Sequence, residues 1–508
     1  MKSDQNTPLW QIWILFFLYT ALVACLIQFI ILPHIFPQFH YGEGLLKNGD
    51  WLSFHDIAVK LNNKIRLEGW RAWELRAGPF NEPICGIVGA IYALIIPKPW
   101  TLIPLNAALH ATSALLLILI MEFFSTRKKA IFASLPFFLY PSAAIWYAAI
   151  HKDGFFIDGL FLYLYGLLLL TSNINKIRSF KKDIIGFLTI ISGASLVYLF
   201  RPYSIQMMLL MTSTVMAILF IFTVVKLFKK QYSWFIVFKT MAYLLIITRI
   251  LLFFTSKNDI ILKPPQITAT APSHLTLDTA PSHLTLDTAP SRDIPLQEKS
   301  LQGVAVENLN NNGSGSQKEP IIDTNPRHFN FKNSSMITAI KIFFDSKISS
   351  LKQSRHGFAA SGGLTLIDNK RDFKTIGDFL RYIPRLIQIS FFSPFPSMWF
   401  EKGEYDTSII MRCGSTFEMV ITYFFFFFLP YAIWLLRSKK EIWIVLIFLC
   451  GFILLYGFVV INIGTLYRIR YGFIMPFVAF GVLGLISFIE NLRDNRMNKI
   501  NRINSKED

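Results

Sequence analysis

Long apolar runs separated by short polar segments occupy most of this chain. Most of the runs are close to the roughly 20 residues that a helix needs to cross the hydrocarbon layer of a bilayer. The pattern predicts an all-α integral membrane protein with about ten transmembrane helices. The expected spans are residues 9–32, 101–124, 130–150, 155–173, 184–200, 204–228, 233–255, 415–436, 441–462 and 471–490.

One further apolar stretch, residues 84–97, is short and closes with Pro97-Lys98-Pro99. Cytoplasmic loops carry an excess of Lys and Arg, so the basic clusters between the runs decide whether this stretch crosses the membrane. If it does not cross and the N-terminus is cytoplasmic, every cluster falls inside. We therefore interpret it as an interfacial or re-entrant helix; an eleventh span with inverted charge is the alternative. The clusters are residues 127–129, 176–182, 226–230 and 437–440.

This topology places both termini in the cytoplasm of a multi-pass protein, and we expect the bacterial inner membrane as its location. The first run is too long for a typical signal peptide and lacks a clean small-x-small cleavage site, so we interpret it as a retained helix. The polar segments 33–100 and 256–414 then lie outside. Nearly every unusual polar residue falls on that outer side, so we expect any functional site to face away from the cytoplasm.

Composition excludes two other classes of protein. Charged residues make up 16% of the chain, against about a quarter in soluble domains, which excludes a soluble enzyme. The net charge of +18 could suggest a nucleic-acid partner. The basic residues sit in short clusters between apolar runs, however, which is typical of cytoplasmic loops and not of a nucleic-acid groove. The four cysteines show no metal-binding or disulfide spacing.

The large outer loop changes character along its length. Residues 256–335 contain a duplicated nine-residue sequence, at Thr270–Asp278 and Thr279–Asp287, and this composition predicts disorder. Residues 336–355 and 372–395 instead show helical spacing of apolar side chains, which predicts amphipathic helices on the bilayer surface. The expected organisation is an N-terminal membrane module, 1–255, with its first outer loop, 33–100; a disordered loop, 256–335; outer amphipathic helices, 336–414, with a kink or break at Pro384; and C-terminal helices with a basic tail, 415–508.

Two carboxylates stand at the outer ends of predicted helices. Asp50 comes just before an amphipathic helix, where it could accept a proton from an incoming hydroxyl or could simply cap the helix. Asp153 follows Lys152 in the turn between two spans. Charged side chains at that depth cost free energy unless they meet opposite charges or water. The two residues could therefore belong to a shared polar cavity or form an ion pair with each other.

Three arginines stand at the outer ends of predicted spans, against the usual charge rule. Arg201 precedes Pro202-Tyr203, and Arg468 and Arg470 stand in the segment that ends at Tyr471. A guanidinium forms two charge-assisted bonds with a phosphate, which suits a phosphate site. The alternative is that these side chains reach lipid headgroups.

The order and the predicted positions of these residues resemble those of the GT-C superfamily of membrane glycosyltransferases, in particular aminoarabinose transferases and protein O-mannosyltransferases. The resemblance covers roughly residues 9–255 and the final helices. One departure is Trp51, which stands where an acidic residue often follows the first Asp. The matching positions are Asp50 with Phe54, Ile57 and Ala58; the segment Phe80-Asn81-Glu82-Pro83-Ile84; Asp153 as the second acidic residue; the large outer loop after the seventh span; and Arg470-Tyr471 followed by Pro476.

The resemblance implies transfer of a sugar from a polyprenyl-phosphate donor in the bilayer to a glycan, lipid or protein acceptor, as in the building of cell-envelope polysaccharide. Asp50 would act as the base on the acceptor hydroxyl, and Asp153 would position it or hold a divalent cation. The arginines would hold the lipid phosphate. The cofactor is otherwise unknown, and no residues form a recognisable metal motif. The remaining substrate-binding candidates are Glu82, Lys152, Tyr203 and Tyr471.

Three other functions stay open at the level of sequence. They are a polymerase or ligase of undecaprenyl-linked polysaccharide units, a transporter or flippase, and a non-catalytic assembly protein. The glycosyltransferase hypothesis makes a geometric prediction that the others do not require. Asp50, Asp153, Arg201 and Arg470 should meet in one outer cavity.

Overall fold

A computed structural model describes residues 7–79, 81–174, 180–261, 351–359, 365–373, 375–401 and 408–504. The repeats at 270–287 and most of the first expected amphipathic helix, 336–355, lie outside the described residues. The chain divides into a unit of Met1–Leu262 with Ile342–Asp508 and a second unit, Lys263–Lys341. All contacts reported below belong to the first unit.

Among the described residues, nine helices are long and apolar enough to cross a membrane, or up to ten if one bent pair counts as a single span. The prediction of an all-α, multi-pass membrane protein is therefore confirmed. The helices are α1 (Leu9–Leu26) with its π-helical extension η1 (Ile27–Ile35), α4 (Ile103–Met121), α7 (Asp153–Ser172), α8 (Phe180–Phe200), α9 (Ser204–Phe228), α10 (Trp234–Ile261), α13 (Ser408–Leu436), α14 (Lys440–Val459) and α15 (Ile463–Asn504), and the bent pair is α5 (Arg127–Leu139) with α6 (Pro141–Tyr147).

The bend between α5 and α6 measures 67°. Tyr140, between the two helices, has extended backbone angles. This follows from Pro141, because the residue before a proline is pushed out of the helical region. Proline also lacks the N–H group that would continue the helix. The expected span 130–150 is thus two helices that meet at an angle.

The first outer loop folds into short elements that lie together at one end of the bundle. A two-stranded antiparallel pair, β1 (His40–Gly42) and β2 (Leu45–Leu46), precedes α2 (Asp50–Glu68). The apolar stretch around residues 84–97 forms α3 (Pro83–Leu94), whose 12 residues are too few to span a bilayer. This agrees with the predicted interfacial helix. The remaining short turns are η2 (Pro37–Phe39), η3 (Trp70–Ala72), η4 (Pro99–Leu102) and η5 (Pro396–Met398).

Glycines bring two central helices into close contact. A Cβ atom on Gly193 of α8 would lie 2.5 Å from the carbonyl oxygen of Gly159 on α7. A Cβ on Gly166 would lie 2.7 Å from the carbonyl oxygen of Gly186. Only residues without a side chain permit this approach, as is usual where membrane helices pack tightly. The α7–α8 pair forms a rigid base for the loops at both of its ends.

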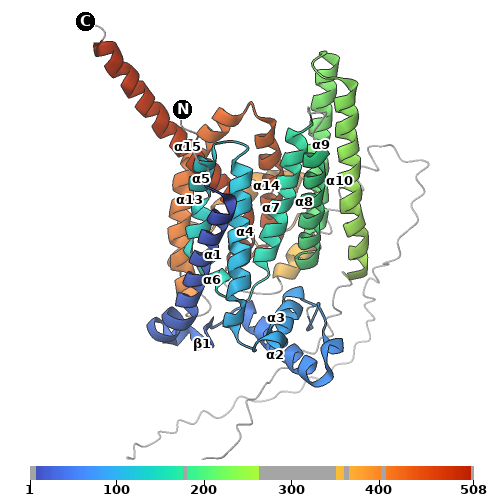
Figure 1. Cartoon of the computed structure of the whole chain (residues 1–508), viewed down its shortest axis with the longest axis vertical. Coiled ribbons are helices and arrows are strands. Elements are labelled where there is room, and N and C mark those ends of the chain that lie inside the picture. Colours follow the sequence, from blue (N-terminus) through green and yellow to red (C-terminus); the bar gives the residue numbers. More distant parts are fainter. Residues whose placement is uncertain are drawn as a thin grey trace, which may run out of the picture. The chain divides into compact units, whose positions relative to one another are not determined.

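The two ends of the bundle differ in charge. Figure 1 shows the start of α1 and the end of α15 at one end, and α2 and α3 at the other. The basic clusters gather at the first of these ends: Lys129 pairs with Glu490 at 2.6 Å, and Lys439 donates to the carbonyl of Phe123 at 3.1 Å. This is the clustering that the predicted topology requires; which end faces the cytoplasm stays a prediction.

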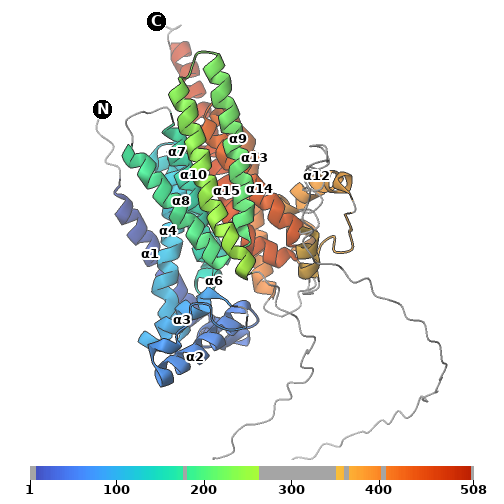
Figure 2. The ribbon, with the colours of Figure 1, turned by 90° about the vertical axis from the view of Figure 1, so that its right-hand side faces the viewer.

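One outer helix, α12 (Ile376–Phe392), lies alongside α14 (Figure 2). Thr375 caps it, and Asp378 completes a capping box. Its start is thus fixed by side chains three residues apart, as the capping-box pattern requires. A kink or break was expected at Pro384; the helix is not broken there and continues to Phe392.

Candidate functional site

Asp50 is the first residue of α2, and Gly49 takes the N-cap position. The capping alternative for Asp50 is therefore wrong, although a carboxylate in the first turn still favours the helix dipole. Its Oδ2 atom accepts a bond of 2.8 Å from Nη2 of Arg468 on α15. The carboxylate remains 58% exposed. It is therefore held in place and still open to a second partner.

Arg468 also reaches the second carboxylate. Its Nε atom lies 3.2 Å from Oδ2 of Asp153, the first residue of α7. One guanidinium thus bridges the two acidic residues that the sequence analysis singled out. Segments from the first loop, the middle of the chain and the last span meet at this point, as the hypothesis of a shared site predicts.

Arg201, in the turn between α8 and α9, completes the group. Its Nη2 pairs with Oδ1 of Asp153, and its Nη1 donates to the Tyr203 hydroxyl at 2.8 Å. Its guanidinium also stands 5.0 Å from the centre of the Phe156 ring. We call Asp50, Asp153, Arg201 and Arg468 the charge cluster. Its two negative and two positive charges balance, which is the condition for keeping ionised groups largely out of water.

Lys152 does not pair with Asp153, so the mutual ion-pair alternative is wrong. Lys152 pairs instead with Glu82, which stands just before α3. Two residues predicted to bind substrate thus form a second ion pair, adjacent in sequence to the cluster. The reason is geometric, because Asp153 is already occupied by two guanidiniums.

His151 adds an uncharged donor beside the cluster. Its Nδ1 accepts the backbone N–H of Asp153 at 3.2 Å. Burial lowers the pKa of His151 to about 4, against the opposing influence of Asp153. The ring is therefore neutral at pH 7, and with Nδ1 accepting, its proton is on Nε2. Nε2 of His151 and Nε of Arg201 are buried with no hydrogen-bond partner among the described residues.

Arg470 and Tyr471 face elsewhere, which corrects the predicted meeting of four residues. Arg470 is 1% exposed and donates to the carbonyl oxygens of Ser390, at 2.6 Å, and Ser393 at the end of α12. The Tyr471 hydroxyl donates to the carbonyl of Phe137. Residues two apart on a helix point roughly 200° apart, so α15 can turn only one of Arg468 and Arg470 toward the carboxylates. That residue is Arg468.

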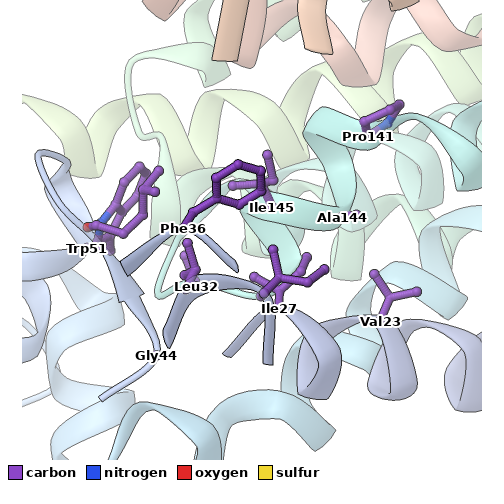
Figure 3. A pocket seen from close by; sticks show the side chains of 13 residues that line it. Val23, Ile27, Leu32, Phe36, Gly44, Trp51, Pro141, Ala144 and Ile145 are labelled. Atoms are coloured by element: carbon purple, nitrogen blue, oxygen red, sulfur yellow. The ribbon is translucent and has the colours of Figure 1, made fainter. Parts of the chain in front are cut away.

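An apolar cavity of about 300 Å³ lies next to the start of α2. Trp51, which follows Asp50, forms part of its wall and donates from Nε1 to the Leu46 carbonyl at 2.6 Å. Figure 3 shows side chains from η1 facing those of α6 across it. Such a lining suits a hydrocarbon chain. The labelled residues of the wall are Val23, Ile27, Leu32, Phe36, Gly44, Trp51, Pro141, Ala144 and Ile145.

The residues at the site do not fit a divalent cation. Within the described parts of the chain, no three His, Cys, Asp or Glu residues gather in a way that could hold a metal ion. Both carboxylates of the cluster face guanidinium groups instead. The cation-binding role that the resemblance allowed for Asp153 therefore finds no support in the geometry, and we derive no step through a metal.

Comparison with protein-family models, curated proteins and solved structures finds no match for this chain. Fold and site define a multi-pass helical membrane protein with a neutral cluster of charged residues at one end. The GT-C resemblance consequently rests on the sequence residues quoted above alone.

Two buried carboxylates inside predicted spans, Asp158 on α7 and Glu418 on α13, were not among the candidates chosen from the sequence. Glu418 on α13 is fully buried and accepts bonds from the backbone N–H of Ser142, at 2.5 Å, and from its hydroxyl, at 2.7 Å. The Tyr467 hydroxyl donates to the same carboxylate. A glutamate inside the apolar run 415–436 was the available signal, since an ionisable residue within a span usually has a function.

Proposed function

We propose that this protein is a membrane glycosyltransferase that moves a sugar from a polyprenyl-phosphate donor to an acceptor hydroxyl on the extracytoplasmic face. One observation carries the proposal: a half-exposed carboxylate, Asp50, is fixed by Arg468 beside a buried carboxylate–guanidinium pair and an apolar cavity. Such a transfer needs three parts: a base, ligands for the phosphate, and a place for the hydrocarbon chain.

The reaction is a single displacement. The acceptor oxygen bonds to the anomeric carbon of the sugar as its proton passes to the Asp50 carboxylate. The bond from that carbon to the phosphate oxygen breaks, and its electron pair leaves on the polyprenyl phosphate. The ion pair with Arg468 holds the Asp50 carboxylate in position to receive that proton. A positioned base contributes roughly 10²–10⁴ in rate.

The leaving phosphate meets donors that the protein does not itself satisfy. Nε of Arg201 and Nε2 of His151 are buried without described partners, and both can donate to a phosphate oxygen. Donors that are fixed before the reaction stabilise charge as it develops and cost no rearrangement at that moment. The cavity beside Trp51 would take the first part of the prenyl chain. The position of the cluster, at the end of the bundle opposite the basic loops, supports an outward-facing site.

The test is transfer of radiolabelled sugar from polyprenyl phosphate in proteoliposomes. Asp50→Asn should lower the rate by roughly 10²–10⁴ while the protein stays folded. The matched control is Asp56→Asn, because Asp56 lies on the same helix and is exposed. It should transfer at the wild-type rate. An Asp50→Asn protein with normal transfer would rule out the proposed base.

A transporter is the second candidate, and the broken α5–α6 span is the observation that favours it. Helices broken near a binding site are common in transporters. The same proteoliposomes separate the two functions. A transporter moves the labelled lipid across the bilayer without forming a new glycosidic bond, whereas the proposed enzyme forms the bond.

A further inference from the structure

Glu418 joins two segments that are far apart in the chain. Its carboxylate accepts two bonds from Ser142 in α6 and one from Tyr467 in α15. It forms no ion pair with any described residue. Glu418 lies near the start of the apolar span Met411–Leu436, where a carboxylate is costly to bury, and three donors partly offset that cost.

Both segments lead to the charge cluster. Tyr467 directly precedes Arg468, the residue that bridges the two carboxylates. The helix that begins at Pro141 ends at Tyr147, a few residues before His151 and Asp153. We propose that Glu418 is a positioning residue: by holding the start of α6 and the Tyr467 turn of α15 together, it sets the position of Arg468 against Asp50 and Asp153. This inference rests on the proposed function.

The bend between α5 and α6 explains why such a residue is needed. Where a helix starts afresh, its first N–H groups have no partner within the helix. Pro141 has no N–H, and Glu418 accepts the next one, from Ser142. One turn further along α13, Thr422 bonds to the Tyr140 hydroxyl at 2.9 Å. The helix α13 therefore holds the bend at two points, and of these two side chains Glu418 is the one that also bonds to α15.

The contact acts through geometry, so the effect of each substitution can be predicted from its hydrogen bonds. In Glu418→Gln the amide oxygen can accept from the Ser142 N–H, and the amide nitrogen can donate to the Ser142 and Tyr467 hydroxyls, because hydroxyls both donate and accept. Glu418→Asp is shorter by one methylene and cannot reach both segments. Glu418→Ala reaches neither. A misplacement of about 1 Å at a reacting group can cost roughly 100-fold in rate.

Sugar transfer in proteoliposomes tests the role. Glu418→Gln should retain kcat within about threefold, whereas Glu418→Ala should lower kcat by roughly 100-fold and change the KM for the lipid donor by less than about threefold. Glu418→Asp should resemble the alanine variant. The matched control, Thr422→Val, removes the contact with the Tyr140 hydroxyl and a bond to the backbone carbonyl of Glu418, but leaves the Glu418 carboxylate and its three donors in place. It should keep the wild-type kcat. A glutamine variant as slow as the alanine variant would overturn the proposal, because the charge or proton of Glu418 would then be required.

Hydrogen–deuterium exchange gives a readout that needs no sugar transfer. Exchange at residues 141–153 and 463–470 should be faster in Glu418→Ala than in wild type and unchanged in Glu418→Gln. Thr422→Val should leave 463–470 unchanged. Unchanged exchange in Glu418→Ala would overturn the positioning role. If the wild-type protein transfers no sugar but exchange follows this pattern, the proposed function fails while the link between the two segments stands.

Discussion

Replacing Arg201 with Met should destabilise the protein more than any surface substitution, because it leaves Asp153 short of a partner. The Arg201 and Asp153 side chains are 3% and 7% exposed. Removing one member of a buried ion pair typically costs about 3–5 kcal/mol. Arg468 still contacts Asp153 at 3.2 Å in the variant, so we expect the lower value, about 3 kcal/mol. The apolar stem of Met keeps the packing against Phe156.

A second substitution separates this effect from a loss of packing. The double variant Arg201→Met/Asp153→Asn removes both charges, and a buried pair replaced by neutral residues often costs little. We therefore expect the second change to restore about 2 kcal/mol of the free energy of unfolding. The assay is denaturant unfolding in detergent, followed by tryptophan fluorescence. Arg493→Met, at a position where the side chain is 75% exposed, is the control and should change stability by less than about 0.5 kcal/mol. If the losses of the two single variants simply added in the double variant, the balance of charge at this site would not explain its stability.

Two further predictions concern pH and topology. Burial holds the pKa of His151 at about 4 in the folded protein against an ordinary 6.5, so the unfolded chain binds the extra proton first as pH falls. The contribution of neutral His151 to the free energy of unfolding should be fully present above pH 6.5 and lost between about pH 6.5 and 4. His151→Gln should flatten this part of a profile of melting temperature against pH. The control His356→Gln, at an exposed position, should leave the profile unchanged. Reporter fusions at Ser172 and Asn310 should show cytoplasmic and extracytoplasmic signals respectively, since Ser172 lies at the basic end of the bundle. A cytoplasmic signal at Asn310, which lies outside the described residues, would contradict both the topology and the proposed function.

The sequence predicts the spans well because hydrophobic length is a local property. The expected span 204–228 and helix α9 agree at both ends, and the short stretch 84–97 forms the helix Pro83–Leu94. The bend at Pro141 was missed, although Pro136 and Pro141 both stand within the apolar run 130–150. An apolar run shows that a segment is buried in lipid or protein and does not show whether it is straight.

The site was predicted in outline and not in detail. Asp50, Asp153 and Arg201 could be chosen because charged residues at the outer ends of spans need partners. Whether Arg468 or Arg470 faces them depends on the rotation of α15 about its axis, which tertiary packing decides. The pairing of Lys152 with Glu82 likewise depends on where α3 lies. The sequence indicates which charged residues lie at the same end of the bundle, but not the partner of each charge.

The way Arg470 holds α12 also bears on how this protein can vary in evolution. Arg470 contacts carbonyl oxygens at Ser390 and Ser393, so it fixes the path of the backbone there and makes few demands on the side chains. At exposed positions of α12, such as Leu380 and Ile387, substitutions can therefore accumulate as long as the path is kept. Arg468 projects from the opposite side of the same helix, so a change that shifted the path would rotate or displace α15 and disturb Asp50. The exposed surface of α12 can thus vary while its attachment to α15 through Arg470 is kept.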